Sequence, residues 1–192
     1  MKYIVLILSM FLLSSCGLKE SKPITEYTLV LEKISPVSSS RYKNKTLKVY
    51  FPQSLKEKLT SGMNYSYSLS DRGTYLNSRW SNSIAQLIQG NIIEALDNSR
   101  IFKGVLPFSS TVAEDYRLEI EIYDFSHHVR GNESNSVVIM KCSLIATHDG
   151  KLKKTRRFFY KIPTKTVDAK GYVEATNIAM NRLMRDLVLW LR

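Results

Sequence analysis

Apolar and polar residues alternate in several short segments of the chain, and an alternation of period two is typical of strands with one buried face. The clearest segment covers residues 115–123, where apolar side chains fall on one face and charged side chains on the other. The apolar set is Tyr116, Leu118, Ile120 and Ile122, and the charged set is Arg117, Glu119 and Glu121. Further strands are expected over residues 26–31, 46–51, 137–147 and 153–162.

Two longer segments place apolar residues three and four positions apart, which is the spacing of a helix with one buried face. The first begins at Trp80, with Ser78 or Ser81 as its N-cap, and ends at Asn98-Ser99. Its apolar stripe contains Ile84, Leu87, Ile88, Ile92, Ala95 and Leu96. The second follows Asp168 as N-cap, and its stripe contains Tyr172, Ala175, Ala179, Leu183, Leu187 and Leu191.

Turn-forming residues separate these elements. Asp149-Gly150 lies between two strand patterns and predicts a hairpin with a type I′ turn, in which both central residues need positive φ. A second hairpin is expected where two short aromatic runs flank residues 71–73. Residues 103–114 and 126–136 are predicted to be loops.

The order of elements predicts an α/β fold of the α+β sandwich type. We expect a mixed, mostly antiparallel sheet with two long helices packed on one face. The length of 192 residues suits one domain, which we place at residues 25–192. A core of this size needs neither disulfides nor a metal for stability.

The N-terminus has the pattern of a secretory signal: one basic residue, then the apolar run Ile4–Leu13, then small residues. The run is too short for a good spanning helix. Leu13-Ser14-Ser15-Cys16 resembles the bacterial lipobox, in which the cysteine thiol receives diacylglycerol. We therefore expect residues 1–15 to be removed, Cys16 to be lipidated and residues 16–24 to form a tether. The alternative is an ordinary signal peptide that happens to contain a cysteine.

Composition narrows the class of protein further. Hydrophobic residues make up 44% of the chain, which excludes general disorder, and two cysteines cannot build a disulfide-rich scaffold. Lys and Arg outnumber Asp and Glu by 28 to 17, which gives a formal charge of +11. Much of the excess lies in residues 151–161, a basic run interleaved with aromatic residues. Because a secreted lipoprotein meets little nucleic acid, this run is interpreted as a solvated edge strand, or as a contact for anionic lipid or an acidic partner.

Residue patterns of enzymes and metal sites are missing from the sequence. It has no phosphate-binding loop, no Gly-x-Ser-x-Gly elbow and no His-Glu-x-x-His motif, so we expect neither catalysis nor a cofactor. His127-His128 and His148 are interpreted as exposed loop histidines, because neighbours on a strand point to opposite faces and chelate poorly. Glu119 and Glu121 are expected on a solvated sheet face, and Cys142 in the core.

The arrangement as a whole resembles the ABC-type transport auxiliary lipoproteins, a PqiC-like family associated with MCE lipid-transport systems. The resemblance covers essentially the mature chain, and it depends on the order and spacing of short motifs. These motifs are the lipobox, Tyr27-Thr28-Leu29, Leu47-Lys48-Val49-Tyr50-Phe51-Pro52, Tyr65-Ser66-Tyr67, the helix opened by Trp80, Leu118-Ile120-Ile122-Tyr123-Asp124-Phe125, the Asp-Gly hairpin and the helix ending near Leu191. Ser81-Asn82-Ser83 after Trp80 departs from the family pattern, in which a Pro often occurs there.

The resemblance implies a non-enzymatic lipoprotein that works with a periplasmic MCE protein, an inner-membrane permease and an ATPase to move lipid or other hydrophobic compounds between membranes. Gly17 after the cysteine, in place of Asp, favours the outer membrane. Because MCE proteins form rings, a homo-oligomer is compatible with this role.

Two other functions stay open from the sequence. A lipopolysaccharide-assembly lipoprotein, which partners an outer-membrane β-barrel, shares the lipobox, the length and an α/β sandwich, although the segment after Cys16 lacks that family's Gly-Phe-His-Leu start. A lipoprotein hydrolase would need Ser, His and Asp side chains brought together at hydrogen-bond distances.

Overall fold

A computed structural model describes residues 23–192, and the predictions for residues 1–22, including Cys16, lie outside this range. The strands are β1 (Thr25–Tyr27), β2 (Thr46–Val49), β3 (Gly62–Ser66), β4 (Arg72–Trp80), β5 (Gly104–Pro107), β6 (Tyr116–Arg130), β7 (Glu133–Ala146) and β8 (Leu152–Pro163). The helices are α2 (Ile84–Ser99) and α3 (Ala169–Leu191). Neither helix is long and apolar enough to cross a membrane.

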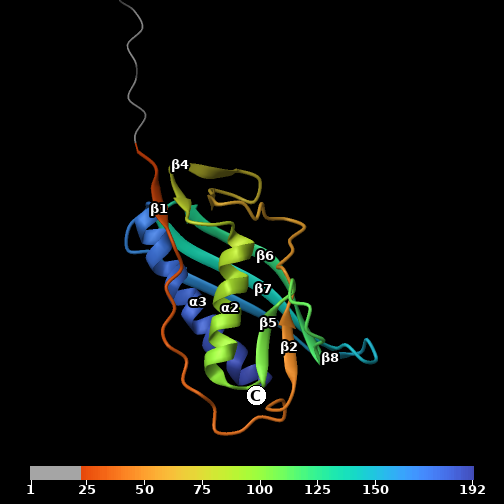
Figure 1. The fold of residues 1–192 in the computed structure, drawn as a ribbon. Coiled ribbons are helices and arrows are strands. Elements are labelled where there is room, and N and C mark those ends of the chain that lie inside the picture. Colours follow the sequence, from red (N-terminus) through yellow and green to blue (C-terminus); the bar gives the residue numbers. More distant parts are fainter. Residues whose placement is uncertain (1–22) are drawn as a thin grey trace, which may run out of the picture.

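The long strand β6 organises an eight-stranded sheet (Figure 1). One edge of β6 pairs antiparallel with β7 from end to end, and β7 pairs in the same way with β8. The other edge is shared, because β2 pairs with the first part of β6 and β3 with residues 127–128 near its end, both in parallel. A register shift between Ile122 and Asp124 marks a bulge where the strand passes from one neighbour to the other.

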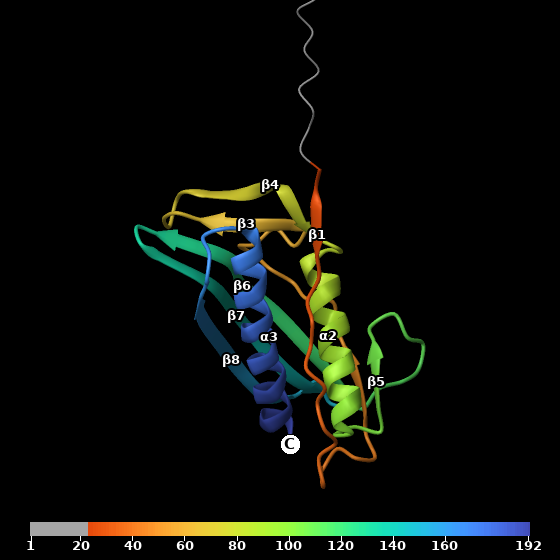
Figure 2. The same cartoon turned by 90° about the vertical axis from the view of Figure 1, so that its left-hand side faces the viewer.

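Both helices cover the same face of the sheet (Figure 2). The apolar stripe of α3 packs on β7 and β8, and α2 packs on β2 and β5 and against α3. Alternate residues of the strands point into this layer, which holds the largest buried side chains, among them Trp80, Phe125 and Tyr172. The predicted fold class is therefore confirmed. The sheet is mixed: its longest pairings are antiparallel, and β1, β2, β3 and β5 also contribute short parallel pairings.

The chain between β1 and β2 runs along the two helices as an extended strap, defined as residues 28–38. The side chain of Asn181 accepts from the backbone N–H of Glu32 at 2.7 Å and donates to the carbonyl of Val30 at 3.1 Å. The backbone N–H of Val37 donates to Ser99 at the end of α2. A strand was expected over residues 26–31, but regular pairing stops at Tyr27, because an asparagine replaces a neighbouring strand as the hydrogen-bond partner.

The predicted loop over residues 126–136 is wrong. Strands β6 and β7 continue through it and meet in a tight turn at Gly131, whose φ of +57° suits glycine. Residues 103–114, also predicted to be a loop, contain the short strand β5. In both places the strand forms because it pairs with a neighbouring strand. The local sequence does not predict it, because it lacks an apolar alternation.

The two helices begin and end close to the predicted positions. Trp80 is the last residue of β4, so the first helix starts later than expected, and Ser83 caps it in place of Ser78 or Ser81. Asp168 caps α3 as predicted, by accepting from the backbone N–H of Gly171 at 2.8 Å.

The predicted β7–β8 hairpin forms, but only Gly150 has positive φ within a connection of five residues, so the turn is not the expected type I′.

Candidate functional site

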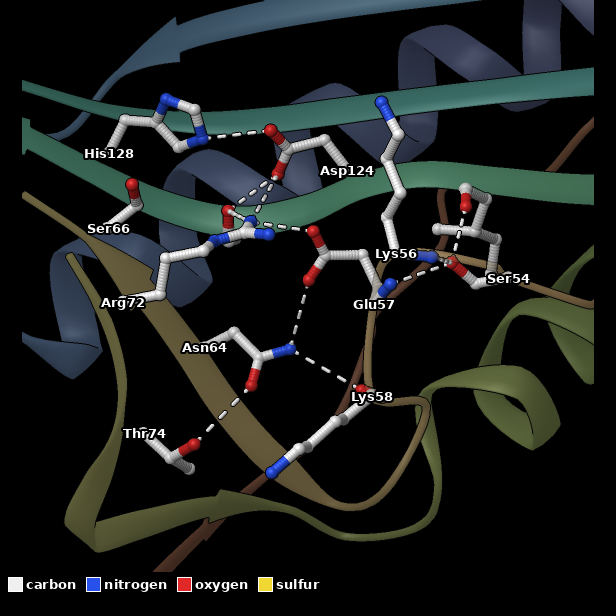
Figure 3. A network of polar contacts seen from close by, with 12 residues as sticks. Ser54, Lys56, Glu57, Lys58, Asn64, Ser66, Arg72, Thr74, Asp124 and His128 are labelled. Carbon is white, nitrogen blue, oxygen red and sulfur yellow. Dashed lines mark hydrogen bonds and ion pairs between the residues drawn. The ribbon is translucent and has the colours of Figure 1, made fainter. Parts of the chain in front are cut away.

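A network of polar side chains fastens the β3–β4 hairpin and the loop before it to the bend of β6 (Figure 3). Glu57 comes from the loop, Arg72 opens β4, and Asp124, Ser126 and His128 lie on the helix-free face of β6. These five residues are called the Glu57–Arg72 cluster below.

The guanidinium of Arg72 is the hub of the cluster. Its Nη2 lies 2.6 Å from Glu57 Oε1, 3.3 Å from Ser126 Oγ and 3.7 Å from Asp124 Oδ1. Asp124 in turn accepts from Ser126 and lies 2.9 Å from Nε2 of His128. The partly exposed guanidinium of Arg72 therefore serves two carboxylates that are themselves largely buried.

Burial dominates the electrostatics of Glu57, whose side chain is only 3% exposed. Desolvation raises the pKa of this carboxyl, although the hydrogen bond and the charge of Arg72 oppose the rise. A cavity of about 170 Å³ opens beside the pair and is lined by Lys56, Glu57, Lys58, Asn64, Arg72, Gly73 and Thr74. Because the cluster joins three segments that are far apart in sequence, its chemical role is to hold the hairpin in place.

On the opposite face of β6, His127 is completely buried under α3. Its Nδ1 lies 2.7 Å from the hydroxyl of Tyr75, its Nε2 lies 2.7 Å from Ser134 Oγ, and its ring stacks on Tyr172. Burial lowers the pKa of His127 to about 4, so the imidazole is neutral at pH 7. The prediction that His127 and His128 are exposed in a loop is wrong, whereas their placement on opposite faces is confirmed.

Other candidate residues lie where the sequence predicted. Cys142 is buried and free, and burial raises the pKa of its thiol to about 12, so it is not reactive. His148 is exposed beside the β7–β8 turn. Glu119 and Glu121 are on the solvated sheet face, where they pair with Arg117 and Lys141. Within residues 23–192, no group of three His, Cys, Asp or Glu side chains could hold a metal ion.

The basic run of residues 151–161 lies in and next to β8, the edge strand beyond β7, as predicted. Phe158 and Tyr160 face the helices, and the hydroxyl of Tyr160 donates to Asp186 on α3. Lys153 and Lys161 point to the solvated side and pair with Asp149 and Glu133. A contact of this run with anionic lipid or an acidic partner stays a prediction.

Sequence reasoning missed the Glu57–Arg72 cluster. Its residues are up to 71 positions apart, since they run from Glu57 to His128, and none belongs to a recognisable motif. Their proximity follows from the parallel pairing of β3 with β6, and nothing in the local sequence predicts that pairing.

Comparison with known proteins gives the family. The family model for the ABC-type transport auxiliary lipoprotein component matches residues 66–188, which run from the β3–β4 hairpin almost to the end of α3. The chain therefore belongs to this family, as its sequence motifs indicated. Its members are lipoproteins, which places the protein at a membrane, and the family name indicates an ABC transport system.

Solved structures share the fold at low sequence identity. A protein from Xanthomonas campestris matches with a TM-score of 0.77 and 17% identity over 86% of this chain and 94% of that one. An uncharacterised protein matches with a TM-score of 0.68 and 16% identity over 89% and 100%. A hypothetical protein from Chlamydia trachomatis matches with a TM-score of 0.50 and 9% identity over 77% and 95%. No curated protein matches the chain.

Proposed function

We propose that the protein is a non-enzymatic auxiliary component of an ABC transport system of the MCE type, anchored to the periplasmic face of the outer membrane. In this proposal residues 1–15 are removed and Cys16 carries the lipid. A tether over residues 16–24 connects the lipid to a single domain, residues 25–192. The observation that carries the proposal is the family match over residues 66–188, together with the lipobox-like sequence before Cys16.

The physical task of such a component is to help lipid cross the periplasm without meeting water. Each exposed CH₂ group of an acyl chain costs roughly 0.8 kcal/mol, so the transport path has to be continuous up to the membrane. A lipoprotein that is fixed at the outer membrane can hold the end of a periplasmic MCE protein there. An inner-membrane permease and an ATPase would supply the energy.

The side chains of the described residues support the proposal of a domain that binds partners without reacting with them. The thiol of Cys142 is buried, and His127 is enclosed by neighbouring side chains. Arg72 forms ion pairs with Glu57 and Asp124 of the same chain. These side chains are thus used to hold the fold together.

The experiment that tests the proposal is the substitution Cys16→Ala in cells that carry an affinity tag on the full-length chain. We expect the variant to leave the membrane fraction, to lose its function and to purify without the MCE protein that accompanies the parent. Cys142→Ala is the matched control, since it removes the other thiol and leaves the lipobox-like sequence intact.

Two other outcomes would contradict the proposal or favour its alternative. A Cys16→Ala protein that stays in the membrane fraction contradicts the lipid anchor. A parent protein that purifies with a large outer-membrane β-barrel and without an MCE protein supports the lipopolysaccharide-assembly alternative.

A further inference from the structure

The β3–β4 hairpin presents large apolar side chains to solvent. Leu69 in its tip is 91% exposed, Leu76 on β4 is 90% exposed, and Tyr67 is 53% exposed. Exposed apolar groups gathered on one supersecondary element are typical of an interaction site.

The hairpin holds these groups on a rigid support. The Tyr65 ring lies 5.0 Å from the ring of Tyr67 and 5.4 Å from that of Tyr75. It also covers Gly73 so closely that a Cβ there would lie 2.5 Å from the tyrosine Cζ. The tip is closed by a backbone hydrogen bond of 2.9 Å from Tyr67 to Asp71, and Arg72, directly beside the tip, joins the hairpin to Asp124 of β6.

The hairpin lies at the end of the molecule from which the chain leads toward Cys16. Strand β1 pairs in parallel with the last residues of β4, at the base of the hairpin, with Thr25 opposite Ser78. Figure 2 shows the hairpin lying across the end of the molecule at which β1 begins, with its tip pointing away from β1. Six residues lie between Cys16 and Pro23, which makes seven steps along the chain. Fully extended, they span at most about 25 Å. A lipid on Cys16 therefore keeps the hairpin close to the bilayer surface.

We propose that the tip of the β3–β4 hairpin docks on the lipid bilayer that holds Cys16. Leu69 enters the boundary between headgroups and acyl chains, and Tyr67, which is also in the tip, lies at the level of the headgroups, where tyrosine is favoured. This docking rests on the proposed lipidation. It gives the anchored domain a fixed orientation, which a lipid on Cys16 alone does not provide.

The same protein offers an internal control at its other end. Leu152 is 57% exposed at the start of β8 and pairs with Ile145, which faces Arg117 near the start of β6. The hairpin pairs with residues 127–128 of the same strand. Ten residues of strand separate the two sites, which corresponds to roughly 33 Å.

The test uses the full-length protein, as cells that process lipoproteins produce it, mixed with vesicles of phosphatidylethanolamine and phosphatidylglycerol. Leu69→Cys and, separately, Leu152→Cys are labelled with the environment-sensitive fluorophore NBD, and buried Cys142 serves to measure background labelling. We expect NBD at position 69 to shift its emission to the blue and to be quenched by spin-labelled lipids. NBD at position 152 should show neither effect.

The outcomes separate the two proposals. If both labelled proteins float with the vesicles and position 69 behaves like position 152, the docking is wrong and the anchor stands. If the full-length chain does not float with the vesicles, the lipid anchor is wrong, and the docking fails with it. Quenching at both positions would show that the domain lies flat on the bilayer, which also contradicts docking through the hairpin.

Discussion

At the scale of single residues, β6 places two neighbouring histidines in opposite environments. His128 lies on the helix-free face beside Asp124, whereas His127 is enclosed by Tyr75, Ser134 and Tyr172. Burial, and not a charged partner, determines the protonation state of His127, because desolvation is the main cause of its lowered pKa. The imidazole is therefore tolerated in the core only as the neutral form.

This burial predicts a loss of stability in mild acid. The pKa of His127 is about 4 in the folded protein and near 6.5 in the unfolded chain. Below pH 6.5 the unfolded chain therefore binds a proton at this residue, and the folded protein does not. The folded protein should lose on the order of 2 kcal/mol between pH 7 and pH 5 from this residue. Urea unfolding at both pH values measures the change, and His127→Gln should remove it.

The matched control is His148→Gln, because His148 is an exposed histidine at the β7–β8 turn. This variant should keep the pH dependence of the parent protein. An equal pH dependence in the parent and in His127→Gln would show that His127 can be protonated without loss of the fold.

The sequence predicted the environment of Cys142 but not that of His127. Cys142 belongs to a regular alternation with Val138, Met140 and Leu144, which identifies its face without knowledge of its neighbours. Around His127 the residues are almost all polar, so no alternation marks a strand. Its burial depends on the contact with α3, which lies about 45 residues further along the chain.

At the scale of elements, the β3–β4 hairpin depends on a buried charge that Arg72 neutralises. Removal of one partner of a buried pair leaves the other charge without compensation. Arg72→Met should therefore lower the free energy of unfolding by about 2 kcal/mol at pH 7, less than for a fully buried pair because the Arg72 side chain is 35% exposed. The loss should become smaller as the pH falls toward the raised pKa of Glu57, because the protonated carboxyl carries no charge.

Arg79→Met is the control for this prediction. Arg79, also on β4, pairs with Glu26 of β1, but both side chains are about half exposed. Such a pair contributes about 1 kcal/mol or less. Equal destabilisation by the two substitutions, measured by urea unfolding, would contradict the inference that Arg72 compensates a buried charge on Glu57.

The elements that the sequence predicted best are those whose own residues show the pattern of that element. Helices α2 and α3 show their apolar stripes, and Asp168 shows its cap. Strands β1 and β5 and the strap of residues 28–38 are short or irregular, and distant partners form them: β4, β2 and Asn181 respectively. For the same reason Trp80 was assigned to the helix, since its place in β4 depends on pairing with β1.

At the scale of the whole molecule, the two ends of the sheet have different chemistry. The end where β1 begins carries the β3–β4 hairpin and leads toward the tether. The other end carries the β7–β8 turn and the first part of the basic run. With a lipid on Cys16, the first end faces the bilayer and the second faces the periplasm, where a transport partner would approach.

This polarity predicts how a longer tether changes the protein. Insertion of about 20 Gly and Ser residues between Gly17 and Leu18 lengthens the six-residue connection from Cys16 to Pro23 about fourfold. The local concentration of the hairpin at the bilayer should then fall roughly eightfold. We expect the lipidated variant to float with vesicles as before, while quenching of NBD at position 69 decreases.

The same insertion after Arg192 is the control and should leave the quenching unchanged. Undiminished quenching with the longer tether would mean that the hairpin binds lipid strongly by itself, and that the short tether does not hold it there.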